Sequence, residues 1–310
     1  MSFTFEKAVS KVAEISKNYH DEAVSPHEIK FESLNHAVVS GQRVELMASA
    51  KRLVSGRFRV PVQYLERCPS DLQAENLNYW IGREAKERDQ LLLRFDGLRL
   101  RAVFTTRYKP LDNLELLNEL PKYGVRPETP VSLKMDNDLF MLQIPDHSKK
   151  FGVGKGDSIV PGVSLTNSET GVMALSIEAF FLRLVCTNGL VTETKENQKF
   201  RHTSKKALDN FQEALANVGH AYAKKQDQLA ISMDSHVDRP MESILSLGKK
   251  FGLDKEDIEL VQNSLNLEYG NTMFHVINAF TRAAQHPTLE ASDIYKMQRA
   301  GGQVLSLVKA

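Results

Sequence analysis

The sequence contains little cysteine and no long hydrophobic run. Its two cysteines, Cys68 and Cys186, lie far apart in the chain, which excludes a disulfide framework and the closely spaced cysteine pairs of a zinc site. No apolar run is long enough to span a bilayer, and the N-terminus lacks the apolar core of a secretory signal. We therefore expect a cytoplasmic protein that does not bind a membrane.

The sequence also has no large excess of basic or of acidic residues. The 310 residues include 40 basic and 39 acidic side chains, which give a formal net charge of +1. This balance excludes a strongly cationic protein that binds any polyanion. A local basic groove can still form, because binding depends on the charge of the contact surface rather than on the total.

Tryptophan occurs once, at Trp80. It lies in a segment from Asp71 to about Arg88 whose apolar residues recur at helical spacing, together with Leu77 and Ile81. We expect Trp80 to pack in the interior rather than to serve as a stacking platform for a ligand.

Several motifs of enzymes and metal sites are absent. The segment His147–Gly156 is rich in glycine and lysine but does not have the spacing of a phosphate-binding P-loop. The acidic run Asp136–Asp138 lacks the further carboxylates of a calcium loop and is interpreted as a turn. No nucleophile stands beside a base in a recognised pattern. We predict no catalytic residue, no cofactor and no metal ion.

The longest apolar stretch, from Ser158 to Thr194, is predicted to form the centre of the fold. Strand-like residues lie on both sides of Asn167–Gly171, whose asparagine, serine, threonine and glycine favour a turn. This pattern predicts a hairpin with a polar loop. Two further hairpins are predicted, from Leu91 to Arg107 around an Asp-Gly pair and from Val131 to Ile144.

Helical periodicity prevails from Thr203 onward. The sequence therefore predicts an α+β fold, with antiparallel hairpins that form a mixed or antiparallel sheet in the N-terminal two thirds and a helical C-terminal part. We expect an α+β domain at residues 1–200 and a helical region at residues 201–310.

The strand after the Asp-Gly turn carries candidate binding residues. Strict alternation places Arg99 and Arg101 on one polar face, and Arg107, Tyr108 and Lys109 extend the basic character beyond the strand. This face is either an ordinary solvated sheet surface or a surface that holds backbone phosphates, with Tyr108 stacking on a base.

Arg183 lies in an apolar run and therefore needs a partner. Glu169 and Glu178 are the nearest candidates in the sequence. Either Arg183 forms a structural ion pair, or it lines a site that receives an anion such as a phosphate. We interpret Asn167, Glu169 and Asn188 as polar residues that order the central hairpin.

A strongly basic segment follows at Lys195–Lys206. Five basic residues and one acidic residue give it a local charge of +4 (5 − 1). A solvated linker and a contact with a polyanion explain this charge equally well. In the second case Lys199, Arg201, Lys205 and Lys206 extend a binding groove.

Three short sequences occur in a fixed order: RAVFTTRYKPLDN (Arg101–Asn113), SLTNSETG (Ser164–Gly171) and RLVCTNGLV (Arg183–Val191). In these the chain resembles a phage- and plasmid-related family of unknown function that is carried by prophages, plasmids and mobile elements. The likeness covers Gln90–Lys206 well and the flanks weakly. It implies a role in DNA maintenance, recombination or host conflict, and it assigns no catalytic residue.

Two main hypotheses of function follow. In the first, which we favour, a homo-oligomeric protein of a phage or mobile element binds DNA, preferably single-stranded, in recombination, annealing or protection, and the basic residues named above form one groove. In the second, a metal-dependent enzyme acts on nucleic acid or a nucleotide through Asp112, Asn167, Glu169, Arg183 and Asn188. A non-catalytic assembly protein, joined through the helical C-terminus, is a third alternative.

Overall fold

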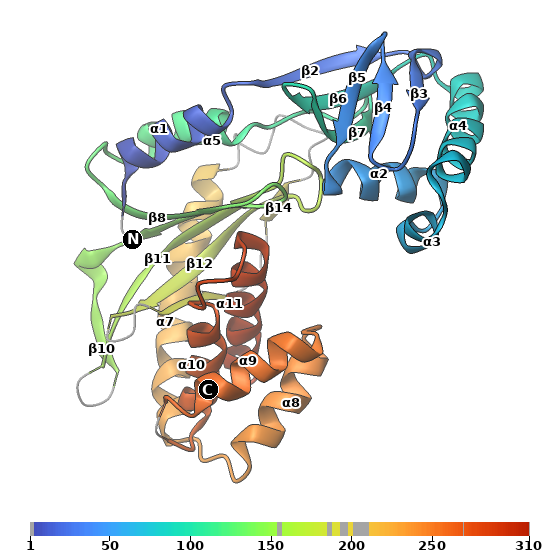
Figure 1. Cartoon of the computed structure of the whole chain (residues 1–310). Coiled ribbons are helices and arrows are strands. Elements are labelled where there is room, and N and C mark those ends of the chain that lie inside the picture. Colours follow the sequence, from blue (N-terminus) through green and yellow to red (C-terminus); the bar gives the residue numbers. More distant parts are fainter. Residues whose placement is uncertain are drawn as a thin grey trace.

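The computed structural model describes residues 3–153, 157–184, 188–192, 198–200, 211–268 and 270–309 of the chain. Within these ranges the strands form two sheets, and two separate hydrophobic cores are present (Figure 1). None of the helices in the described part is both long and apolar enough to cross a membrane. The predicted α+β fold, with sheets in the N-terminal two thirds and helices toward the C-terminus, is confirmed.

The smaller sheet has six strands in the order β2-β6-β7-β5-β4-β3. Its neighbours are antiparallel except β5 and β7, which are parallel, so the sheet is mixed. The β6–β7 hairpin confirms the one predicted around the Asp-Gly pair, and Gly97 takes the positive φ of +55° that its tight turn requires. The strands are β2 (Tyr19–Val24), β3 (Ile29–Phe31), β4 (His36–Val39), β5 (Gln42–Leu46), β6 (Leu91–Asp96) and β7 (Arg99–Thr105).

Three helices pack beside this sheet: α2 (Ala48–Phe58), α3 (Val62–Arg67) and α4 (Ser70–Glu87). Buried side chains of these helices share one core with the strands, including Phe58 and Leu77. Figure 1 shows α3 and α4 at the outer end of the smaller sheet, away from the C-terminal helices. Within the described residues, large side chains of α4 such as Tyr79 stay exposed.

The larger sheet follows the order β1-β8-β9-β11-β12-β13, with β10 paired to β11 and β14 paired to β12. The long β11–β12 pair is the predicted central hairpin, and β8–β9 is the predicted third hairpin. The strands are β1 (Phe3–Thr4), β8 (Pro130–Met135), β9 (Phe140–Pro145), β10 (Phe151–Val153), β11 (Asp157–Asn167), β12 (Leu175–Arg183), β13 (Asn188–Thr192) and β14 (Gln198–Phe200).

The larger sheet shares its core with helices from both ends of the chain. Val12, Phe181 and Phe280 belong to the same buried cluster, so residues before and after position 200 pack together. The domain boundary predicted there adjoins residues 201–210, which lie outside the described residues, and it stays a prediction. The helices are α1 (Phe5–Ile15), α5 (Asn113–Glu119), α7 (Phe211–Asp234), α8 (Pro240–Lys250), α9 (Lys255–Leu265), α10 (Met273–Ala283) and α11 (Ala291–Ser306).

Candidate anion-binding pocket and the polar contacts between the sheets

The turn between β11 and β12 joins the two sheets through buried polar groups. Its residues 167–170 are at most 4% exposed, although turns usually lie at the surface. The Glu169 carboxylate accepts one hydrogen bond of 2.6 Å from Nη2 of Arg101 and one of 2.8 Å from the backbone N–H of Asn113. Asn167 Nδ2 donates to the side-chain oxygen of Asn113 at 2.9 Å. The turn is thereby fixed to the smaller sheet and to α5.

Arg94 on β6 reaches the same turn. It is 2% exposed, pairs with Asp21 at 2.8 Å and with Asp112, and donates to the backbone oxygen of Glu169 at 3.1 Å. Burial opposes the charge of its guanidinium, but the two aspartates outweigh burial and raise the pKa of Arg94. We call this group of side chains the polar joint; it comprises Arg94, Arg101, Asp112, Asn113, Asn167 and Glu169.

The prediction that Arg99 and Arg101 share one solvated face is wrong. The pairing register between β6 and β7 shifts, which makes Arg101 the extra residue of a bulge and breaks the alternation on which the prediction rested. Arg101 is only 3% exposed, and its guanidinium lies 3.5 Å from the centroid of the Tyr19 ring. Arg99 is exposed and pairs with Asp96 of its own hairpin. The surface therefore offers one of these arginines to a ligand, not two.

The residues after β7 also differ from expectation in part. The Tyr108 ring stacks on Phe104, with ring centroids 3.8 Å apart and planes 6° from parallel. Burial raises the pKa of the Tyr108 hydroxyl to about 12. One face of the Tyr108 ring is thus already covered, which weakens its predicted role in stacking on a base. Arg107 and Lys109 are exposed and have no ion-pair partner among the described residues.

Arg183 lies at the end of β12 that is remote from the turn. Its Nε and Nη2 each donate to one oxygen of Asp157 at 2.9 Å, and its Nη1 donates to Glu268 at 2.7 Å. Its partners are therefore not Glu169 or Glu178, the nearest acidic residues in the sequence. Burial opposes the charge, but the two carboxylates raise the pKa of Arg183. Because all three nitrogens are engaged, the geometry is that of a structural ion pair.

The basic residues selected from the sequence do not gather in one trough within the described part of the chain. At about 3.3 Å per residue, β12 measures about 26 Å from its first residue to Arg183, which separates Arg183 from the polar joint. Of the other residues selected from the sequence, Arg201, Lys205 and Lys206 lie outside the described residues, and so do the side chains of Lys199 on β14 and Asn188 on β13.

The polar constellation of the enzymatic hypothesis is assembled only in part. Asp112, Asn167 and Glu169 meet at the polar joint, whereas Arg183 lies at the other end of β12. Each of the two carboxylates already faces an arginine. Across the described ranges, no group of three or more histidine, cysteine, aspartate or glutamate side chains is arranged to hold a metal ion.

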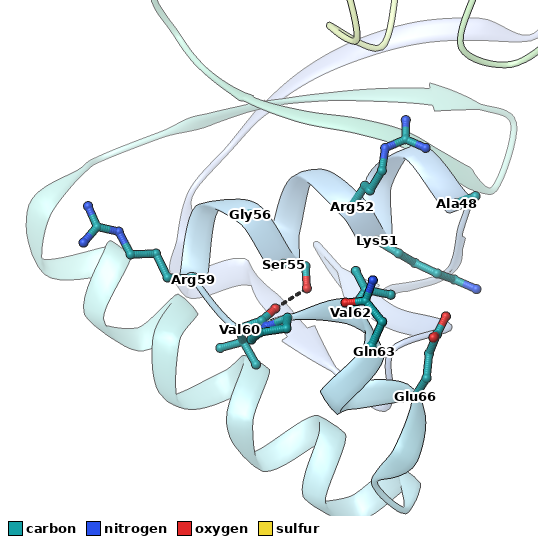
Figure 2. Close-up of a pocket in the computed structure, with 11 residues that line it drawn as sticks. Ala48, Lys51, Arg52, Ser55, Gly56, Arg59, Val60, Val62, Gln63 and Glu66 are labelled. Carbon is teal, nitrogen blue, oxygen red and sulfur yellow. Dashed lines mark hydrogen bonds between the residues drawn. The ribbon is translucent and has the colours of Figure 1, made fainter. Parts of the chain in front are cut away.

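An open pocket of about 730 Å³ lies between α2 and α3 (Figure 2). Three cationic side chains line it, and one carboxylate opposes them, which leaves a charge of +2 (3 − 1). In Figure 2, Gln63 and Glu66 of α3 lie across the pocket from Lys51, while Arg52 and Arg59 extend outward at its rim. Cations around a concave surface favour the binding of an anion.

The cations of this pocket remain accessible. Arg52 pairs with Asp138 at 3.0 Å but keeps 50% of its side chain exposed, and Lys51 donates to the side-chain oxygen of Asn35. Arg59 is exposed and forms no ion pair with the described residues. It also ends α2 in the left-handed conformation, with φ +56° and ψ 33°. This conformation costs a residue with a side chain about 1 kcal/mol, and such strain is concentrated at functional sites.

The pocket residues were not among those selected from the sequence, although a signal is present. The segment Ala48–Arg59 contains four basic residues and no acidic residue. Its charge of +4 equals that of Lys195–Lys206 over the same length. One of the four, Arg57, pairs with Glu84 at 2.7 Å, and the other three line the pocket. A search for segments without acidic residues would have found it.

Comparison with known proteins places the chain in a family without giving it an activity. The family model described as "Domain of unknown function (DUF932)" matches residues 101–300, more than half of the chain. The match includes the central hairpin and the turn of the polar joint, but the pocket between α2 and α3 lies before its first residue. No curated protein and no solved structure matches the chain. The chain therefore belongs to the family defined by this domain of unknown function, DUF932.

Proposed function

We propose that this protein binds single-stranded DNA and that DNA phosphates occupy the pocket between α2 and α3. The observation that supports this most directly is that Lys51, Arg52 and Arg59 line one open pocket whose only acidic lining residue is Glu66, although Arg52 also forms an exposed ion pair with Asp138. Guanidinium groups donate paired hydrogen bonds to phosphate oxygens, and single strands bind along positively charged surfaces.

The proposal rests on residues other than the strand arginines. Arg101 and Arg183 already hold carboxylates in the interior, so they have no part in it. Arg107 and Lys109 are exposed without an ion pair to the described residues and are retained as further phosphate contacts. The enzymatic alternative has less support, because Asp112 and Glu169 face arginines.

Several finer expectations accompany this proposal and stay predictions. They are the association with phages, plasmids and mobile elements, a task in recombination, annealing or protection, assembly into a homo-oligomer, and a cytoplasmic location. Their support is the resemblance of the central region to the phage- and plasmid-related family.

Fluorescence anisotropy with a labelled oligothymidylate of about 20 nucleotides would test the proposal. Three phosphate contacts on a single strand predict a slope of about −2 for log affinity against log salt. The affinity should therefore fall roughly 20-fold between about 50 and 200 mM NaCl. Arg52→Ala combined with Arg59→Ala should lower the affinity about tenfold at the lower salt concentration and flatten the slope.

Two controls separate binding from folding. Lys122→Ala combined with Arg239→Ala removes two exposed cations on other elements and should leave the affinity unchanged. Arg59→Gly removes one pocket charge and relieves the left-handed backbone, so it should weaken DNA binding while stabilising the fold by about 1 kcal/mol. Full affinity in the Arg52/Arg59 double variant, or no binding at about 50 mM NaCl, would contradict the proposal.

A further inference from the structure

The helices next to the pocket expose an unusual set of large side chains. Tyr64 of α3 is 46% exposed, and Leu72, Tyr79 and Trp80 of α4 are 38%, 58% and 36% exposed. The expectation that Trp80 packs in the interior is therefore wrong. The interior face of α4 is formed instead by Gln73, Leu77 and Ile81.

The exposed residues of α4 lie along one face of the helix. Leu72, the partly buried Asn76, Tyr79 and Arg83 follow each other at intervals of three or four residues, and Trp80 lies between this row and the buried face. Because α4 stands at the outer end of the smaller sheet (Figure 1), the described part of the chain does not cover this face.

The aromatic side chains are held in place before any ligand arrives. The rings of Tyr79 and Trp80 meet edge to face, with centroids 5.2 Å apart. The Arg83 guanidinium lies 5.9 Å from both ring centroids and donates a 3.2 Å hydrogen bond to the Tyr79 hydroxyl. Side chains fixed in this way lose little conformational freedom on binding. We call Tyr64, Leu72, Tyr79, Trp80 and Arg83 the aromatic face.

Tyr64 connects the aromatic face to α3. A hydrogen bond with Cys68 is the main reason why the pKa of Tyr64 is raised, and its hydroxyl also meets Asn76 in the exposed row of α4. On the same short helix, Gln63 and Glu66 line the pocket. The short helix α3 thus contributes residues both to the pocket and, through Tyr64, to the aromatic face.

We propose, on the basis of the function proposed above, that the aromatic face stacks the bases of the strand whose phosphates lie in the pocket. Aromatic rings stack on every base regardless of sequence, and an adjacent arginine adds a cationic contact. The neighbouring pocket, with its charge of +2, favours an anionic partner over a neutral peptide. Single-stranded DNA combines this negative charge with exposed planar bases.

The single tryptophan makes this inference directly testable. Trp80 is the only tryptophan in the chain, so fluorescence excited selectively at tryptophan reports on the aromatic face in the full-length protein. An oligothymidylate of about 20 nucleotides should quench this fluorescence. Inorganic polyphosphate should bind in the pocket, displace the labelled oligonucleotide and leave the fluorescence unchanged, because it carries phosphates but no bases.

Matched variants of Tyr79 supply the second readout. Tyr79→Ala should weaken oligothymidylate binding about tenfold, as the loss of one stacked base predicts, without changing the affinity for polyphosphate. Tyr79→Phe keeps the ring and should bind like the unmodified protein. Since the Tyr79 side chain is largely exposed, neither variant should unfold.

The outcomes distinguish this inference from the function on which it rests. One outcome is that DNA binds without quenching Trp80 fluorescence and with the same affinity in the Tyr79→Ala variant. That result would contradict base stacking on the aromatic face and leave phosphate binding in the pocket intact. Loss of both DNA and polyphosphate binding would remove both proposals. A third outcome is that DNA does not quench the fluorescence, while the protein self-associates with rising concentration and Tyr79→Ala abolishes this association. The aromatic face would then bind a second copy of the chain instead of DNA.

Discussion

The interior arginines and the arginines of α2 differ in the groups that they face. Arg94, Arg101 and Arg183 are buried or nearly buried, and each contacts at least one carboxylate. Arg52 and Arg59 lie exposed at the rim of an open pocket; Arg59 has no ion pair to the described residues, and Arg52 has only the exposed pair with Asp138. Arginine is thus used in two ways within one chain.

This difference follows from the cost of burying charge. An isolated ion in the interior costs several kcal/mol, so a buried guanidinium persists only where carboxylates and hydrogen bonds compensate for the lost water. An exposed guanidinium remains hydrated and needs no such partner. The location of an arginine therefore decides whether it serves the fold or remains available to a ligand, and the count of basic residues does not.

The largest expected effect comes from breaking the buried pair at the polar joint. Glu169→Gln removes the charge that faces Arg101 while conserving the size of the side chain. Both groups are almost fully buried, and an uncompensated buried charge costs about 3–5 kcal/mol. Urea denaturation should show a loss of stability of this size.

A double-mutant cycle sharpens this result. Arg101→Met alone should also be strongly destabilising, whereas Arg101→Met with Glu169→Met replaces the pair by apolar groups and should cost less than the two single losses combined. If the two single losses of stability add up in the double variant, Arg101 and Glu169 act independently. Pairing with a carboxylate would then not explain why Arg101 is tolerated in the interior.

Much of the fold could be predicted from local sequence, because turn residues and alternation act over short distances. The hairpins around Gly97 and after Asn167 are confirmed for this reason. The partner of Arg101 could not be predicted, since Glu169 is 68 residues away in the chain. The bulge at Arg101 has no local signal either, because it depends on how β6 and β7 pair.

The candidate site was harder to predict than the fold. Trp80 shares a helix with the buried residues Leu77 and Ile81, and hydrophobicity alone does not tell which apolar side chains face inward. The basic character of α2 was readable from composition. That its cations surround a concave surface depends on the packing of α3 beside α2, which no local pattern encodes.

Lys225 on α7 breaks the rule that a buried cation faces a carboxylate. It is 6% exposed, and its Nζ donates to the Ser306 hydroxyl at 2.8 Å, with no ion pair to the described residues. Burial, with a smaller contribution from Lys224, lowers the pKa of Lys225 to about 8. We expect Lys225→Met to raise stability at neutral pH by roughly 1 kcal/mol, because it removes a buried charge.

The lowered pKa of Lys225 also determines how the effect of this substitution changes with pH. Between about pH 8 and the usual lysine pKa near 10.5, the unfolded chain holds a proton that the folded chain has released, so the stability of the unmodified protein rises with pH. The advantage of Lys225→Met should therefore be largest below pH 8 and shrink above it. Thermal unfolding followed by circular dichroism at both ends of this range would measure the difference. An advantage that does not change with pH would assign the effect to packing instead of charge.

The smallest effect is expected at Arg99, the only strand arginine of β7 that stays exposed. Its partner Asp96 lies three residues away in the same hairpin, and such exposed pairs contribute about 0.5 kcal/mol or less. Arg99→Ala should therefore leave urea denaturation almost unchanged and should not alter the affinity for oligothymidylate measured by anisotropy. A tenfold loss of affinity would instead restore β7 as a phosphate-binding surface and show that an exposed ion pair can open to receive DNA. Because Arg52 is likewise exposed and paired, with Asp138, such a result would leave burial as the property that separates the two kinds of arginine.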